Sequence, residues 1–127
     1  MFLNPTAVSP YTTAVRAIGE TVRAGLRADI PVSLCGEMAS NPLAIPILIG
    51  LGIKELSGSP SAVPVIKEII HALESGGADA DARAARQAGT AEEVRAIGAR
   101  RLRAVGLLEH ADIGPWLKSI VDEADRG

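Results

Sequence analysis

The sequence has little of what disulfides, zinc sites and stacking surfaces require. It contains one cysteine, Cys35, with two histidines and three aromatic residues among 127 positions. A single cysteine cannot form an internal disulfide, and His71 and His110 have no partners at zinc-ligand spacing. A reducing compartment is therefore expected.

Clustered positive charge is also missing. The 13 basic and 15 acidic residues give a net charge of -2 and form no basic block, so nucleic-acid binding is not expected. The longest apolar run, Leu43 to Ile53, is interrupted by proline and glycine and is far shorter than the ~20 residues that span a bilayer. No signal peptide is visible at the N-terminus, so we expect a cytoplasmic location and no membrane contact.

The stretch that remains informative is Pro31 to Pro60. A hydrophobic content of 47% and a length of about one domain favour a packed core. Alternation over residues 32–36 predicts a short strand that ends at Cys35. Chemistry in α/β folds is placed at such a carboxyl end, before the next helix. Cys35 is therefore the leading candidate for a functional residue, and a buried, inert cysteine is the alternative.

Apolar spacing predicts a helix that starts with Ser9 as cap and Pro10 as first residue and ends at Asp29. Its apolar face comprises Tyr11, Val15, Ile18, Val22 and Leu26. Its charged residues, Arg16, Glu20, Arg23 and Arg27, are interpreted most simply as a solvated surface.

The next segments alternate between helix and strand. Asn41 and Pro42 predict a buried, nearly all-apolar helix over residues 42–52, with Pro46 shortening its regular part. A second strand is expected within residues 55–59, followed by a helix with the apolar stripe Val63, Ile66, Ile70 and Leu73. This order indicates an α/β fold with parallel strands. Two strands cannot form a stable parallel sheet alone, so the segment is expected to belong to a larger sheet.

Residues 78–127 are predicted to form a helical tail that packs on these units or on a partner chain. Thr90 and Glu93 match a capping box, and the helix they open has the apolar stripe Val94, Ile97, Leu102 and Val105. A last helix is expected from Pro115, with Trp116 and Ile120 on one side and Leu117 and Val121 adjacent.

The run CGEMASNPLAIPILIGLGIKELSGSPSAVPVIKEII resembles the C-terminal part of phosphoenolpyruvate-protein phosphotransferase, Enzyme I of the bacterial sugar phosphotransferase system. The resemblance covers about residues 9–96. It is carried by the Cys-Gly-Glu turn at Cys35, the run Ile49 to Gly52, the run Leu56 to Pro60, and Ile66 with Lys67. Pyruvate phosphate dikinase and phosphoenolpyruvate synthase share the region and are the runners-up. The Met after Cys-Gly-Glu and the pattern around Thr90 to Glu93 look more like Enzyme I.

The resemblance implies that residues 1–75 are the last strand-helix units of a (β/α)8 barrel and that residues 76–127 are a C-terminal helical tail. It implies that Cys35 donates a proton to the methylene carbon when phosphoenolpyruvate becomes pyruvate, a step that a thiol can perform near neutral pH. Gly36 would let the backbone approach the substrate, and Glu37 would orient the loop. The parent enzyme would use Mg2+, would form a homodimer, and would pass the phosphoryl group through a phosphohistidine to the histidine-containing carrier protein.

The departures from the family are also informative. The family's phosphate-binding arginines, its Mg2+ ligands and its phosphohistidine domain have no counterpart in this sequence, and Val65 stands where an arginine is usual. We therefore expect this chain alone to be inactive and to bind no metal. His71 and His110 match no phosphohistidine motif and are interpreted as ordinary surface or helix-end residues. The alternative function is a non-catalytic element of dimerisation or assembly.

Overall fold

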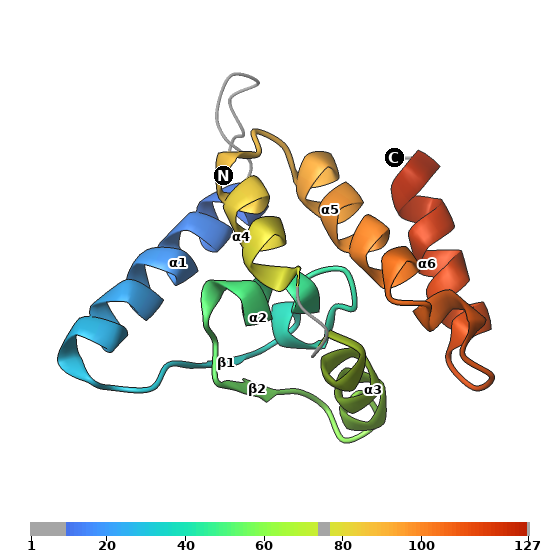
Figure 1. The fold of residues 1–127 in the computed structure, drawn as a ribbon, viewed down its shortest axis with the longest axis horizontal. Helices are drawn as coiled ribbons and strands as arrows, with labels where there is room; N and C mark the ends of the chain where they lie inside the picture. Colours follow the sequence, from blue (N-terminus) through green and yellow to red (C-terminus); the bar gives the residue numbers. More distant parts are fainter. Residues whose placement is uncertain (1–9, 74–76, 127) are drawn as a thin grey trace.

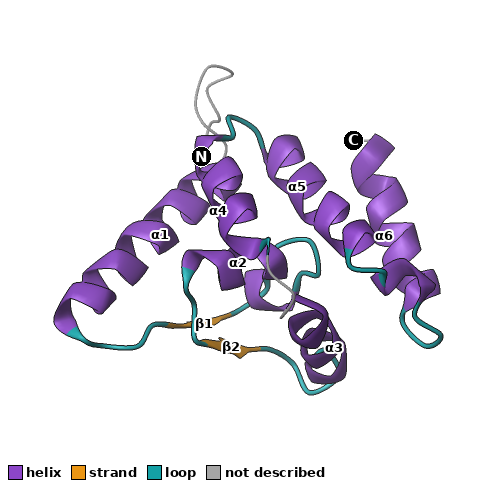
Figure 2. Cartoon of the chain, in the orientation of Figure 1, coloured by secondary structure: helices purple, strands orange, loops and turns teal. Residues whose placement is uncertain are grey.

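The computed structural model describes residues 10–73 and 77–126, which are mostly helical with two short strands (Figures 1 and 2). The α-helices among them are α1 (Pro10–Ala28), α2 (Ile45–Leu51), α3 (Val63–Leu73), α4 (Ala78–Gln87), α5 (Ala91–Ala104) and α6 (Gly114–Arg126). The strands are β1 (Ser33–Cys35) and β2 (Glu55–Ser57), and the short 3-10 helices are η1 (Met38–Ser40) and η2 (Leu107–Glu109).

Helix α1 forms where the apolar spacing predicted it. Val15 and Val22 are buried, but Leu26 is 70% exposed, which corrects its assignment to the buried face. The helix ends because Asp29 takes a left-handed conformation with φ 57°. The Ile30 N–H then donates to the Gly25 carbonyl at 2.8 Å, which completes the helix stop. The expected cap, Ser9, lies outside the described residues, as does the side chain of Tyr11.

Helix α2 lies at the centre and contributes to every core cluster of the described residues. Ile45 joins a cluster with α3, α5 and α6, Ile47 joins one with α1, α4 and α5, and Leu48 packs with α1 near the strands. The predicted all-round burial is thus confirmed. The helix starts later than predicted, at Ile45, with Pro46 in its first turn. Asn41 precedes it in a turn, where its Oδ1 accepts from the Leu43 N–H at 3.0 Å.

The close contact between α2 and α4 depends on a glycine, Gly50 of α2. A Cβ placed on Gly50 would lie 1.9 Å from the carbonyl oxygen of Ala78. The backbones therefore approach within a distance that only glycine allows. The buried residues of α4 are all alanines, which permits the same close approach. Figure 1 shows α4 directly above α2, with α1 to the left and α5 and α6 to the right.

The two strands form a small parallel sheet, so the coarse α/β prediction agrees with the structure. Ser33 pairs with Glu55, Leu34 with Leu56, and Cys35 with Ser57. Helix α3 follows β2 as expected. Its buried residues are Ile66, Ile69 and Leu73. Val63, predicted to be part of the buried stripe, is 38% exposed because it stands at the first turn of the helix.

The C-terminal helices pack on the preceding units. One core cluster joins Ile66 and Ile69 of α3 with Leu102 of α5 and with Leu117 and Val121 of α6. The first of the two alternatives for the tail is therefore confirmed. The predicted capping box is also present, because Thr90 Oγ1 accepts from the Glu93 N–H at 3.1 Å. In return, Glu93 Oε2 accepts from the Gly89 N–H at 2.7 Å.

Candidate functional site

The carboxyl ends of β1 and β2 lie at the same edge of the sheet because the strands are parallel and Cys35 pairs with Ser57. The ladder continues before the strands, where the Lys54 N–H donates to the Val32 carbonyl at 3.1 Å. Leu34 and Leu56 turn toward the core, as partly buried members of the cluster around Leu48. Strand alternation consequently turns the Cys35 side chain away from that core.

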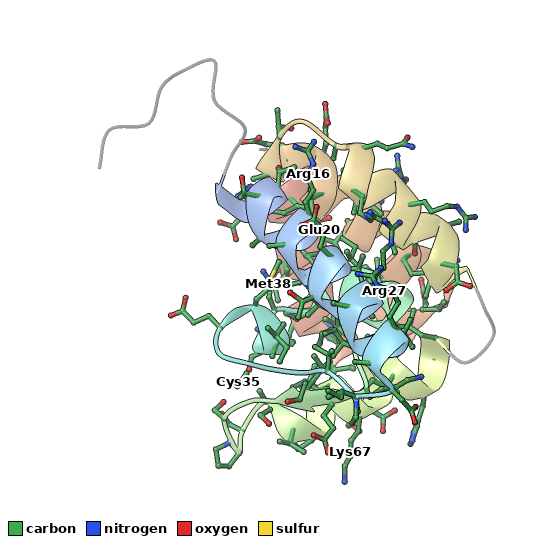
Figure 3. The ribbon with its side chains drawn as sticks, turned by 90° about the vertical axis from the view of Figure 1, so that its left-hand side faces the viewer. Arg16, Glu20, Arg27, Cys35, Met38 and Lys67 are labelled. Carbon is green, nitrogen blue, oxygen red and sulfur yellow. The ribbon has the colours of Figure 1, made fainter. Side chains whose placement is uncertain are left out.

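Cys35 is a free, exposed cysteine, so the burial assumed in the alternative interpretation is not found. Figure 3 shows it at the surface, beside the loop that leads to Met38. The chain turns directly after it, at Gly36, whose φ of +107° favours glycine. A Cβ at Gly36 would meet nothing within 4 Å, so the backbone of this turn is open to an approaching molecule.

Glu37 ends the turn and is the N-cap residue of η1. It has helical backbone angles, and its carbonyl accepts from the Ser40 N–H at 3.1 Å. Its side chain is exposed and makes no cap hydrogen bond. The loop is anchored by Ala39, which is fully buried. The three residues predicted from sequence therefore form one open turn, held in place from its C-terminal side.

A pocket of about 300 Å³ lies between η1, the start of α3 and α6. It is lined by Ser40, Ser61, Ala62, Val65 and Trp116. Hydroxyl groups and an indole face it, with no charged side chain among the lining residues. Because a bound phosphate needs cations, this pocket alone cannot neutralise one. Sequence reasoning did not find it, because nothing in the sequence indicates that Trp116 lies near Ser61.

The described residues contain no group of three or more His, Cys, Asp and Glu side chains that could hold a metal ion. The side chain of His110 stabilises the turn before α6, because its Nδ1 accepts a hydrogen bond from the Asp112 N–H at 3.2 Å. Its Nε2 lies 3.4 Å from Glu68 Oε2. This agrees with the prediction that His110 is a helix-end residue.

Across residues 10–73 and 77–126, no helix has both the length and the apolarity needed to cross a bilayer.

The described strands and helices place the chain in the α/β class with parallel strands. Ligands of such folds bind at the carboxyl ends of the strands, which is where the exposed Cys35 lies. Comparison with known proteins makes the class specific, because residues 6–75 match the family described as "PEP-utilising enzyme, PEP-binding domain". The chain belongs to this family, and the resemblance noted in the sequence is confirmed.

Several curated relatives are similar to this chain. A phosphoenolpyruvate-protein phosphotransferase of Haloferax volcanii is 40% identical over 83 residues, which is 65% of this chain and 15% of the relative. One of Bacillus sp. strain S is 37% identical over 86 residues, 67% of this chain and 15% of the relative. A multiphosphoryl transfer protein of Xanthomonas campestris pv. campestris is 34% identical over 95 residues, 75% of this chain and 11% of the relative.

The chain thus spans only about 10% to 15% of the length of the curated relatives it matches. No solved structure matches it.

Proposed function

We propose that the chain is the C-terminal segment of a phosphoenolpyruvate-protein phosphotransferase. In this proposal the whole enzyme takes the phosphoryl group of phosphoenolpyruvate and passes it through a phosphohistidine to the histidine-containing carrier protein. The observation that carries the proposal is the exposed Cys35 at the carboxyl edge of β1, within the segment that matches the family. The position of Cys35 supports the proposal, because catalytic residues of such barrels stand at the carboxyl ends of the strands.

The architecture proposed for the whole enzyme is a (β/α)8 barrel. Residues 1–75 would supply its last strand-helix units, and residues 76–127 the helical tail. The strands β1 and β2 pair only with each other among the described residues, so each has an edge that further parallel strands could extend. The exposed Leu26 and Ile30 lie near the other end of the strands, where additional units would cover apolar surface.

The chemical role proposed for Cys35 is proton donation. Loss of the phosphoryl group from phosphoenolpyruvate leaves the enolate of pyruvate, which must gain a proton at its methylene carbon. The Cys35 S–H bond breaks, a C–H bond forms, and the resulting thiolate is reprotonated from solvent. The open backbone at Gly36 would allow the substrate to approach, and Glu37 would orient the turn.

This chain alone is proposed to be inactive. Phosphoryl transfer needs cations around the phosphate, and the pocket beside the carboxyl edge presents none. In the proposal, the parent enzyme binds Mg2+ through residues outside the described part of this chain. Its N-terminal domain meets the carrier protein, and the parent is a cytoplasmic homodimer.

A chimaera tests the role of Cys35. This chain would replace the matching segment of the Bacillus sp. phosphotransferase, and pyruvate formation would be followed with the carrier protein as acceptor. Cys35→Ala is expected to lower turnover by about 10²- to 10⁴-fold, as for the loss of a general acid, without weakening phosphoenolpyruvate binding. Ser33→Ala is the matched control, because Ser33 is exposed on the same face of β1. Unchanged turnover in the Cys35→Ala chimaera would remove the proton-donor assignment.

A second measurement tests the incompleteness of the site. Backbone amides of residues 34–39 would be followed by NMR while the chain is titrated with phosphoenolpyruvate and Mg2+. We expect no saturable shifts at millimolar ligand, because the cations that hold the phosphate are missing. Saturable shifts centred on Cys35 would show instead that this chain builds a substrate pocket by itself.

A further inference from the structure

A groove between α1 and α4 collects arginines from both helices. It has a volume of about 420 Å³, within the range of small-molecule sites. Its lining is Arg16, Glu20, Arg23, Arg83, Arg86 and Gln87. Four guanidinium groups and one carboxylate leave it with a net charge of about +3, in a chain whose overall charge is -2. None of these residues belongs to the turn at Cys35.

Two of the arginines are held in place by the fold. Arg16 Nε donates to the Arg86 carbonyl at 3.1 Å, and its second guanidinium nitrogen donates to the Ala88 carbonyl at 3.3 Å. Arg16 thereby satisfies carbonyls at the C-terminal end of α4 and complements the helix dipole. Arg86 is half-buried and lies against α1, with its Nε 3.4 Å from the position of a Cβ on Gly19. Figure 3 shows Arg16 with Glu20 on neighbouring turns of α1.

The other arginines of the groove form no ion pair with the described part of the chain. Across residues 10–73 and 77–126, the ion pairs are Arg101 with Asp81, Arg103 with Asp125, and His110 with Glu68. Arg23, Arg83 and Arg86 are in none of them. Asp79 lines the adjoining depression together with these arginines, so it lowers the local positive charge without forming an ion pair. Like charges gathered this way repel each other unless an anion joins them.

We propose that the groove between α1 and α4 binds a diphosphate group. Arginine forks match the geometry of phosphate oxygens, and a diphosphate carries enough negative charge to balance the net charge of the groove. Arg16 and Arg23 lie seven residues apart on α1, about 10 Å along the helix, so a ligand with two phosphoryl groups suits the length of the groove better than a single orthophosphate. The diphosphate can be free pyrophosphate or part of a nucleotide. In either case it would link α4 to α1.

The test uses the full chain and two ligands at constant ionic strength. Inorganic pyrophosphate and ADP would each be titrated by calorimetry, with orthophosphate for comparison, and thermal unfolding would be recorded with and without ligand. We expect saturable binding, weaker binding of orthophosphate, and a higher Tm with the diphosphate ligand. Equal affinity for pyrophosphate and ADP supports recognition of the diphosphate alone, and tighter ADP binding supports a nucleotide ligand.

Variants of the lining residues should change the affinity for pyrophosphate in opposite directions. Arg83→Gln, at an exposed position, is expected to weaken pyrophosphate binding about tenfold, the effect of one charge-assisted contact. Arg86→Gln should do the same. Glu20→Gln removes the one carboxylate from the lining and should tighten binding by about threefold. Arg100→Gln is the matched control, because Arg100 is exposed on α5 away from the groove.

Circular dichroism would establish that each variant is folded. Absence of saturable binding overturns the proposal. The proposal is also overturned if Arg83→Gln and Arg100→Gln weaken binding equally. Affinity would then depend on the net charge of the chain and not on the residues that line the groove.

Discussion

Replacing Gly50 with alanine is expected to separate α4 from α2. An ideal Cβ at this position lies 1.9 Å from the Ala78 carbonyl oxygen, 2.6 Å from its carbonyl carbon and 3.0 Å from Ala82 Cβ. Carbon and oxygen approach no closer than roughly 3.3 Å even in weak C–H···O contacts. The two helices must therefore move apart by more than about 1 Å. Backbone atoms cannot rotate away as a flexible side chain would.

Two opposing effects set the magnitude. Alanine favours a helix over glycine by roughly 0.5–1 kcal/mol, which on its own would stabilise the variant. Overpacking of a well-packed core costs about 1–3 kcal/mol, and the rigid obstacle places Gly50→Ala at the upper end. The same movement loosens the cluster in which Ile47 of α2 meets Ala85 of α4. We expect a net loss of about 2 kcal/mol in the free energy of unfolding.

The measurement is urea unfolding followed by far-UV circular dichroism. Gly19→Ala is the matched control, because Gly19 is also inside a helix but its Cβ would meet only the Arg86 and Leu51 side chains, at 3.4 Å. This control is expected to gain about 0.5–1 kcal/mol from helix propensity. If Gly50→Ala were as stable as Gly19→Ala, the close contact of α2 with α4 would be refuted.

Two further predictions concern the C-terminal helices. Asp81→Asn should reduce the free energy of unfolding by about 1–2 kcal/mol, since Arg101 donates to both carboxylate oxygens of Asp81, at 2.6 and 3.1 Å. The hydrogen bond to Asp81 raises the pKa of Arg101 above its ordinary value, so on the alkaline side this contribution is complete below that ordinary pKa and declines as strong base deprotonates Arg101. A urea midpoint of the unmodified chain that stays constant across neutral pH would agree with this expectation. If the Asp81→Asn variant had the same midpoint as the unmodified chain, the stabilising role of the ion pair would be contradicted. Thr90→Ala should cost about 1 kcal/mol through loss of the α5 cap, whereas Thr90→Ser should retain stability; equal losses in both would exclude capping as the cause.

The candidate site shows how far sequence patterns reach. Alternation over a few residues was enough to predict the strand that ends at Cys35. The packing of Leu34 on the core then decides that the Cys35 side chain points outward. The left-handed turn at Gly36 follows from a residue type that adopts such angles without strain. The pocket beside this edge could not be predicted, because Trp116 reaches Ser61 only through the packing of α6 against α3 and α5.

The arginines of α1 were interpreted as a solvated surface. That interpretation considered α1 alone and took no account of α4. In the tertiary structure Arg16 and Arg23 meet Arg83 and Arg86, some 60 to 70 residues further along the chain. No local pattern relates these positions. Packing of α4 against α1 decides that four charges share one groove.

The sequence by itself determined the local elements, because helical periodicity, caps and strand alternation act over a few neighbouring residues. It predicted α1, α3, α5 and α6, both strands, and the burial of α2. Only the tertiary structure decided which faces meet. Leu26 continues the apolar spacing of α1 yet stays exposed, while Ala78 and Ala82 of α4, which form no large apolar stripe, become buried against Gly50. The physical reason is that contact depends on shape and distance between helices, and a sequence pattern records only the side chains that each helix has to offer.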